Sequence, residues 1–163
     1  MIDARELLQR LADRNLKLGS VESLTAGLFG STVCEVPGAS MVYRGGLITY
    51  DPALKVSLAN VSAKGIDEQG VVSAKVATEM AEGGRKALGC DVCVSCTGNA
   101  GPDVQKGGQP VGTVFLGLAY QGNVWTVPLH LQGTRNEIRK ATVDAMIAFA
   151  ASLFPAAPEE GKK

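Results

Sequence analysis

The chain has 163 residues, the usual size of one domain, and can bury most of the surface that its unfolded form exposes. Sixteen basic residues balance sixteen acidic ones without any long run of Lys or Arg, which gives no electrostatic basis for a general nucleic-acid or membrane-surface role. No apolar run approaches the roughly 20 residues that span a bilayer, and the N-terminus has no leader pattern, so we expect one cytoplasmic domain over residues 1–163 with a disordered tail over 155–163.

In the first part of the chain, apolar periodicity and turn residues predict alternating helices and strands. Asp3 is a typical N-cap residue, and the leucines that follow at helical spacing predict an amphipathic first helix. The next expected elements are a strand over 16–21, a helix over 26–35, a helical turn over 39–44, a strand over 45–50, and a short helix that begins at Asp51-Pro52 and ends near Asn60. Residues 62–70 are expected to be a connection.

The second part predicts a helix over 73–88, weakened locally by Gly83-Gly84, and a buried strand over 91–97. A loop over 98–110 leads to strands over 111–120 and 124–131, which a Gln-Gly-Asn turn joins as an antiparallel hairpin. Thr134 and Glu137 form a capping box that opens a helix through Leu153. This order predicts an α/β fold, a three-layer α/β/α sandwich with a mixed, mostly parallel five-stranded sheet.

The cysteines raise the question of a metal site, since Cys90, Cys93 and Cys96 have C-x-x-C-x-x-C spacing. Alternation along the strand over 91–97 predicts that Cys93 points away from the other two. No histidine lies nearby to complete a zinc set. We therefore expect no metal, and reduced cysteines that act as small core residues.

A polar turn follows the first strand. The residues from Glu22 to Leu28 place two hydroxyls, those of Ser23 and Thr25, and free backbone N–H groups where a helix begins. Such a helix N-terminus suits an anionic or polar ligand group. The alternative is ordinary capping by Ser23 or Thr25, and the spacing does not choose between the two.

The segment 36–55 carries the main candidate for chemistry, Ser40 with Lys55, and Tyr50 and Arg44 lie between them. A serine becomes a nucleophile when a neighbouring base takes its proton, and a neutral lysine amine can be that base. Because lysine titrates near ~10.4, burial or a positive charge such as that of Arg44 would have to lower its pKa toward roughly 7 to 8. Tyr50 could relay a proton or hold the lysine. The single histidine, His130, lies in an expected strand and is not a competing base.

Distance is the difficulty for this pair. Ser40 precedes the strand over 45–50 and Lys55 follows it, and five strand residues advance roughly 16 Å at ~3.3 Å per residue. The side chains can meet if residues 39–44 turn back beside the strand, or if Lys55 serves the Ser40 of another subunit. Taken singly, each residue also has a structural explanation, as a helix cap, a solvated charge or an edge aromatic.

Four motifs occur in one order between Val21 and Leu153: Glu22-Ser-Leu-Thr-Ala-Gly27; Pro37-Gly-Ala-Ser40 with Arg44-Gly-Gly and Thr49-Tyr50; Thr97-Gly-Asn-Ala-Gly-Pro102 leading to Pro110-Val-Gly112; and Gly133-Thr-Arg135 with Arg139. With these motifs the chain resembles the CinA C-terminal domain family, whose active members are nicotinamide-nucleotide amidases. The resemblance implies a mixed-sheet α/β/α fold and the metal-free hydrolysis of nicotinamide mononucleotide (NMN) to nicotinate mononucleotide and ammonia.

The resemblance also implies roles for single residues. Ser40 would be the nucleophile, with Lys55 and Tyr50 as its partners, and Arg135 and Arg139 would hold the phosphate unless they only form a solvated face. The implied substrate-binding residues are Ser23, Thr25, Gly27, Arg44, Thr97, Gly98, Asn99, Ala100, Gly101, Arg135 and Arg139. We expect no cofactor, a small nucleotide substrate, no nucleic-acid or membrane partner, and a homo-oligomer of two or more subunits.

Some residues depart from the family pattern. Leu24 and Ala26 replace a cysteine and a glycine, Asn99 stands where an aliphatic residue is usual, and Gln109 replaces a lysine. These changes bear on the identity of the substrate more than on the reaction type. They leave two other hypotheses open, a catalytically silent nucleotide-binding or interaction module and an amidase for another amide. The larger N-terminal domain of some members has no counterpart here, so we expect the amidase half alone.

Overall fold

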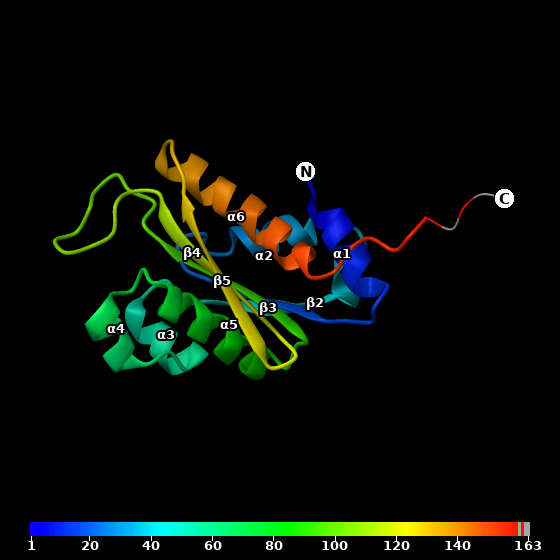
Figure 1. The fold of residues 1–163 in the computed structure, drawn as a ribbon, viewed down its shortest axis with the longest axis horizontal. Coiled ribbons are helices and arrows are strands. Elements are labelled where there is room, and N and C mark those ends of the chain that lie inside the picture. The colour runs from blue at the N-terminus through cyan, green and yellow to red at the C-terminus, as the bar shows by residue number, and fades with distance from the viewer. Residues whose placement is uncertain (160, 162–163) are drawn as a thin grey trace.

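The computed structural model describes residues 1–159 and 161, so part of the expected disordered tail lies outside the described residues. Its sheet has five strands in the order β2-β1-β3-β4-β5 (Figure 1). The strands are β1 (Leu18–Glu22), β2 (Tyr43–Ile48), β3 (Val92–Gly98), β4 (Thr113–Tyr120) and β5 (Asn123–His130). β1 pairs in parallel with β2 and β3, whereas β4 runs antiparallel to both β3 and β5. All strands except β4 therefore share one direction, and the predicted mixed, mostly parallel sheet is confirmed.

Helices cover both faces of the sheet (Figure 1). One layer contains α1 (Ala4–Ala12), α2 (Leu28–Cys34) and α6 (Arg135–Ser152), and the other contains α3 (Pro52–Ala59), α4 (Ala63–Gln69) and α5 (Ala74–Leu88). A short 3-10 turn, η1 (Ala39–Met41), precedes β2. The predicted three-layer sandwich is confirmed. Within residues 1–159 and 161, no helix has the length and apolar character needed to cross a membrane.

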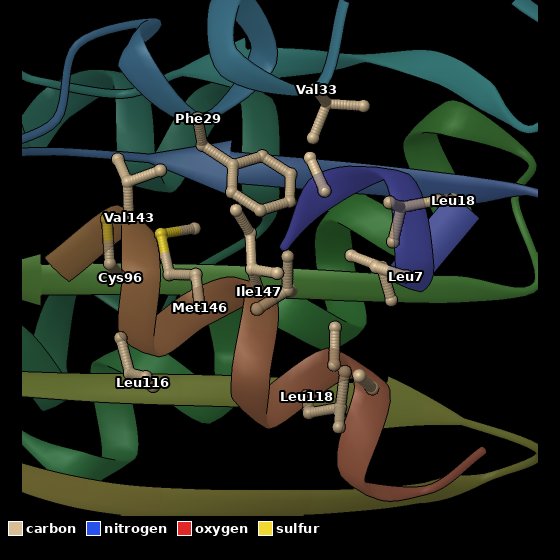
Figure 2. Packing of buried hydrophobic residues seen from close by; sticks show 14 of the residues in the cluster. Leu7, Leu18, Phe29, Val33, Cys96, Leu116, Leu118, Val143, Met146 and Ile147 are labelled. Carbon is tan, nitrogen blue, oxygen red and sulfur yellow. The ribbon is translucent and has the colours of Figure 1, made fainter. Parts of the chain in front are cut away.

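The larger part of the core lies between the sheet and the layer of α1, α2 and α6 (Figure 2). Leu7, Phe29 and Met146, from one helix each, are fully buried in one cluster with Leu116 and Leu118 of β4. A smaller cluster fills the other side of the sheet between β1, β3, α3 and α5. Burial of this apolar surface is the main force that fixes the two helical layers on the sheet.

The predicted helix starts form because each one has its capping residue. The Asp3 side chain accepts a hydrogen bond from the Glu6 N–H at 2.9 Å, and Asp51 caps α3 ahead of Pro52. The capping box of Thr134 and Glu137 opens α6 as expected. Helix α4 was not predicted, because it contains few apolar residues.

The glycine pair in α5 allows close packing. A Cβ at Gly83 would lie 1.6 Å from the carbonyl oxygen of Ala59 in α3, and a Cβ at Gly84 would lie 2.2 Å from the Val21 side chain in β1. The local weakness that the sequence suggests at this pair is therefore offset by the close approach of α3 and the sheet. This close packing holds α3 against α5, and α5 against β1.

Three of the four cysteines are buried as expected, on the two sides of the sheet, whereas Cys34 is exposed at the end of α2. Cys96 packs in the core beneath α2 and α6, whereas Cys93 packs beneath α5. The prediction that Cys93 points away from Cys96 is confirmed, but the same prediction for Cys90 is wrong. Cys90 precedes β3, so strand alternation does not govern it, and it lies in the same cluster as Cys93. In the described part of the chain, no three His, Cys, Asp or Glu side chains group as metal ligands.

Candidate active site

Lys55 is fully buried, which is rare for a lysine. It lies one turn into α3, and its Nζ donates a hydrogen bond to Ser23 Oγ at 2.9 Å and another to the Thr49 carbonyl oxygen. Because both acceptors are neutral, the charge of an ammonium group at this position has no ion-pair partner among these hydrogen bonds. The site therefore favours the neutral amine.

The pKa of Lys55 follows from this environment. Burial lowers it from 10.5 to about 8, and the smaller influences of Cys96 and of the Asp51 carboxylate act in the opposite direction. A lysine with a pKa of about 8 is partly neutral near physiological pH and can accept a proton. Arg44 does not cause this shift, contrary to the sequence-based hypothesis, since it is exposed on β2 and is not among the groups that shift it.

Ser23 is the partner that the fold gives to Lys55. It directly follows β1, and Lys55 belongs to the helix that follows β2. Because β1 and β2 are parallel, with Glu22 opposite Ile48, their carboxyl ends meet at one edge of the sheet. This edge is where α/β proteins usually bind ligands.

A cavity of about 620 Å³ opens at this edge, a size suited to a nucleotide-sized ligand. It lies between the β3–β4 loop, the start of α3 and the start of α6. Its lining residues are Ser23, Leu24, Tyr50, Asp51, Pro52, Val71, Val72, Thr97, Gly98, Asn99, Ala100, Gly101, Pro102, Asp103, Gln105, Gly108, Gln109 and Arg135. Eight sequence-predicted residues, namely Ser23, Tyr50, Arg135 and the five from Thr97 to Gly101, are thus in one cavity.

Ser40 lies at the opposite end of β2, before its first residue, whereas Ser23 and Lys55 lie at the carboxyl ends of the strands. The expected helical turn forms as η1, but it stays at the amino end of β2 and does not double back toward Lys55. The six residues of β2 separate the two sites, which corresponds to roughly 20 Å at ~3.3 Å per residue. Ser40 and Lys55 therefore do not meet within the chain. A Ser40 from another subunit would also have to displace Ser23, because the Lys55 side chain is 0% exposed.

Tyr50 does not hold Lys55, which corrects the role expected for it. Its side chain is 56% exposed at the cavity, and its hydroxyl oxygen accepts a hydrogen bond from Arg135 Nη2 at 3.1 Å. Arg135 Nη1 also donates to the Gly101 carbonyl oxygen at 2.6 Å. Arg135 thus links Tyr50 to the β3–β4 loop and lines the cavity with its guanidinium group.

Arg139 does not line the cavity, so the phosphate binding expected for it stays a prediction, and its guanidinium group contacts the chain itself. Its Nε donates to the Leu24 carbonyl oxygen at 2.8 Å, and its Nη2 donates to the Thr25 carbonyl oxygen at 3.1 Å. Nη1 donates to Asn136 within α6. These bonds fix the turn that carries Ser23 onto α6, so Arg139 positions the serine.

The start of α2 is already occupied, so it is not the anion site that the sequence suggested. The buried Glu22 carboxylate accepts hydrogen bonds from the N–H groups of Phe29 at 2.8 Å and Gly30 at 3.3 Å. The hydroxyl of Thr25 is buried next to Cys96 Sγ at 3.3 Å, and Gly27 lines a separate hollow with Glu22. Neither Thr25 nor Gly27 lines the main cavity.

A comparison with models of known families matches residues 3–154 to the CinA C-terminal domain. The chain belongs to the CinA C-terminal domain family. The resemblance predicted from the sequence motifs is thereby confirmed.

Relatives and solved structures agree with this membership. Our CinA-family chain is 49% identical over 141 residues to a Levilactobacillus brevis protein with the provisional name competence-damage inducible protein, a match that covers 86% of this chain and 34% of that protein. The chain thus spans about a third of the length of the curated relatives that it matches.

Two solved structures share the CinA fold with this chain. The crystal structure of a CinA superfamily protein from Escherichia coli has a TM-score of 0.88 at 29% identity, covering 93% of this chain and 90% of that one. A competence/damage inducible protein from Agrobacterium tumefaciens has a TM-score of 0.88 at 30% identity and 92% coverage of both chains.

Proposed function

We propose that the chain is a metal-independent amidohydrolase that converts NMN to nicotinate mononucleotide and ammonia, with Ser23 as the nucleophile and Lys55 as the base. The observation that carries this proposal is the hydrogen bond of 2.9 Å between the buried Lys55 amine and Ser23 at the cavity wall. Family membership and the cavity size support it further. In this proposal Ser23 takes the role of nucleophile that the sequence had led us to expect for Ser40.

The reaction begins with the neutral form of Lys55. Its amine keeps one N–H bonded to the Thr49 carbonyl oxygen, which turns the lone pair toward Ser23 Oγ. As Oγ attacks the carboxamide carbon, the lysine takes the hydroxyl proton, and it later gives that proton to the departing nitrogen so that ammonia leaves. Water then adds to the acyl-serine and loses a proton to Lys55. The bond between the acyl carbon and Ser23 Oγ breaks, Lys55 returns the proton to Oγ, and the carboxylic acid is released.

Other groups in the cavity suit the charges that develop. Leu24 and Ala100 line the cavity, and their backbone N–H groups are candidates to stabilise the oxyanion. Since Arg135 donates to the Tyr50 oxygen, the phenolic hydrogen is free to donate to the substrate. Arg135 is also the candidate to hold the phosphate, because its fork of donors matches phosphate oxygens.

The direct test is an assay of purified, chelator-treated protein with NMN, in which ammonia and nicotinate mononucleotide are both measured. We expect the two products in equal amounts, and the same rate before and after chelation. The absence of both products would contradict the proposal. Binding of NMN by calorimetry without turnover would instead favour the silent nucleotide-binding module, and turnover of another amide in a substrate panel would favour the third hypothesis.

A further inference from the structure

Asn99 holds the β3–β4 loop together through its side chain. Its Nδ2 donates to the backbone oxygens of Asp103 at 3.2 Å and Gln109 at 3.0 Å, and its Oδ1 accepts from the Gly101 N–H at 2.9 Å. Both amide hydrogens and the carbonyl oxygen are therefore used. One side chain links the beginning of the loop to its end.

The main chain of Asn99 fixes that side chain to the sheet. Its N–H donates to the Thr113 carbonyl oxygen at 3.0 Å, and its own carbonyl oxygen accepts from the Gly112 N–H at 2.8 Å. These two bonds continue the antiparallel ladder of β3 and β4 beyond the pair Gly98 and Val114. Asn99 therefore lies where the loop leaves the β3–β4 ladder, and hydrogen bonds to β4 and the residue before it fix its main chain.

The loop has little other support. Residues 102–110 are all exposed, and the side chain of Val104 is 53% exposed, so the loop has no apolar anchor. A turn bond from the Gly108 N–H to the Gln105 carbonyl oxygen is its main internal backbone contact. Ordering such a segment costs conformational entropy, and the hydrogen bonds of Asn99 offset that cost.

The loop that Asn99 holds is one wall of the cavity. Four residues of its exposed part line the same cavity as Ser23, namely Asp103, Gln105, Gly108 and Gln109. A substrate whose carboxamide lies at Ser23 would meet this wall with its remaining groups. An aliphatic residue at position 99 could form none of the three side-chain hydrogen bonds.

We propose that Asn99 is a positioning residue that sets the affinity for the nucleotide part of the substrate by holding this wall in place. This inference rests on the proposed function, because it assumes that NMN places its carboxamide at Ser23. Asn99 does not touch the reacting atoms in this account. Its loss should therefore act on substrate binding and leave the chemical step nearly unchanged.

The test compares Asn99→Leu, which removes all three bonds, with Asn99→Asp, which keeps the acceptor for Gly101 and loses both donors. Asn123→Ala, at the exposed first residue of β5, is the matched control. Two quantities are measured for each protein: amide hydrogen exchange over residues 102–110, and KM and kcat for NMN.

For Asn99→Leu we expect faster exchange in the loop and a KM raised about tenfold or more, with kcat within about threefold of the wild type, because each lost hydrogen bond contributes modestly and the three act together. Asn99→Asp should fall between Asn99→Leu and the wild type, and Asn123→Ala should match the wild type. Unchanged exchange, an unchanged KM, or an equal loss of kcat with no change in KM would overturn the inference.

The two proposals fail in different ways. If the wild type binds NMN without turning it over, the proposed function fails, and the dissociation constant from calorimetry replaces KM as the test of Asn99. Weaker binding by Asn99→Leu would then support the inference, and equal binding would overturn it. If NMN neither reacts nor binds, both proposals are wrong.

Discussion

At the scale of single residues, the unusual group is a lysine whose side chain is 0% exposed. Burying an ammonium group without an ion-pair partner costs free energy, and this desolvation is what lowers the pKa of Lys55. The same environment that destabilises the fold at neutral pH makes the amine available as a base. Replacing Lys55 by an apolar residue should therefore stabilise the protein and abolish its activity.

Lys55→Met tests this relation. The folded pKa of Lys55 is about 8 and the unfolded value 10.5, so below pH 8 both states hold the proton and the full cost is present. Between pH 8 and 10.5 only the unfolded state stays protonated, and the wild type gains stability as pH rises. The variant should exceed the wild type in unfolding free energy by up to about 3 kcal/mol at pH 7, since each pKa unit corresponds to about 1.4 kcal/mol. It should also be inactive.

Denaturant titrations of both proteins between pH 7 and 10.5 measure this difference. It should shrink as pH rises, and subtracting the two curves removes the titration of all other groups. A difference that stays constant between pH 7 and 10.5 would contradict a depressed pKa.

The backbone at Ala26 offers a second prediction at this scale. Ala26 has a positive φ of 46°, in the turn that carries Ser23, where a side chain other than glycine is strained. Ala26→Gly should therefore raise the unfolding free energy by about 0.5 to 1 kcal/mol, because the relief of strain exceeds the added flexibility of the unfolded chain. Thermal unfolding at fixed pH measures the change, and a lower midpoint would contradict the prediction.

At the scale of elements, helix packing decides the position of Lys55 more than helix propensity does. A Cβ at Gly83 would collide with the Ala59 carbonyl of α3, the helix that carries Lys55. Gly83→Ala should therefore destabilise the protein by about 1 to 3 kcal/mol, although alanine favours an isolated helix by about 1 kcal/mol. Glu82→Ala, at the exposed neighbouring position, is the control and should change stability little. A stabilised Gly83→Ala protein would show that α3 is free to move.

Helix α6 acts on the site through Arg139, which holds the Ser23 turn by two carbonyl oxygens. Arg139→Lys keeps the charge but cannot make both contacts, so we expect kcat for NMN to fall about tenfold with little change in KM. Lys140→Met, an exposed neighbour on the same helix, should be neutral. A raised KM at constant kcat would point instead to the phosphate-binding role that the sequence suggested.

At the scale of the whole molecule, the sequence predicted the layers, the sheet and most element positions, because caps, turn residues and apolar periodicity are local signals. Contacts between segments that are distant in the sequence are harder to predict, because no local signal marks them. Ser23 and Lys55 lie 32 positions apart in the sequence, and they meet because β1 and β2 are parallel neighbours. Applying the rule that ligands gather at the carboxyl ends of parallel strands would have favoured Ser23 over Ser40.

Three other features of the structure were not predicted from the sequence, each for a physical reason. Helix α4 has sequence signals in its Ser62 cap and in Gly70, but Ile66 is its single large apolar residue, so periodicity does not mark it. Glu22 satisfies the α2 N-terminus from within the chain, which the motif alone does not reveal. The role of Asn99 depends on a loop conformation that no periodic pattern encodes.

The central claim is that Ser23, and not Ser40, is the nucleophile paired with Lys55. The most direct measurement is ammonia release from NMN by the chelator-treated wild type, Ser23→Ala and Ser40→Ala, each confirmed as folded by circular dichroism. We predict that Ser40→Ala retains the wild-type rate and that Ser23→Ala loses it by about a thousandfold or more. Loss of activity in Ser40→Ala, with Ser23→Ala as active as the wild type, would contradict the account.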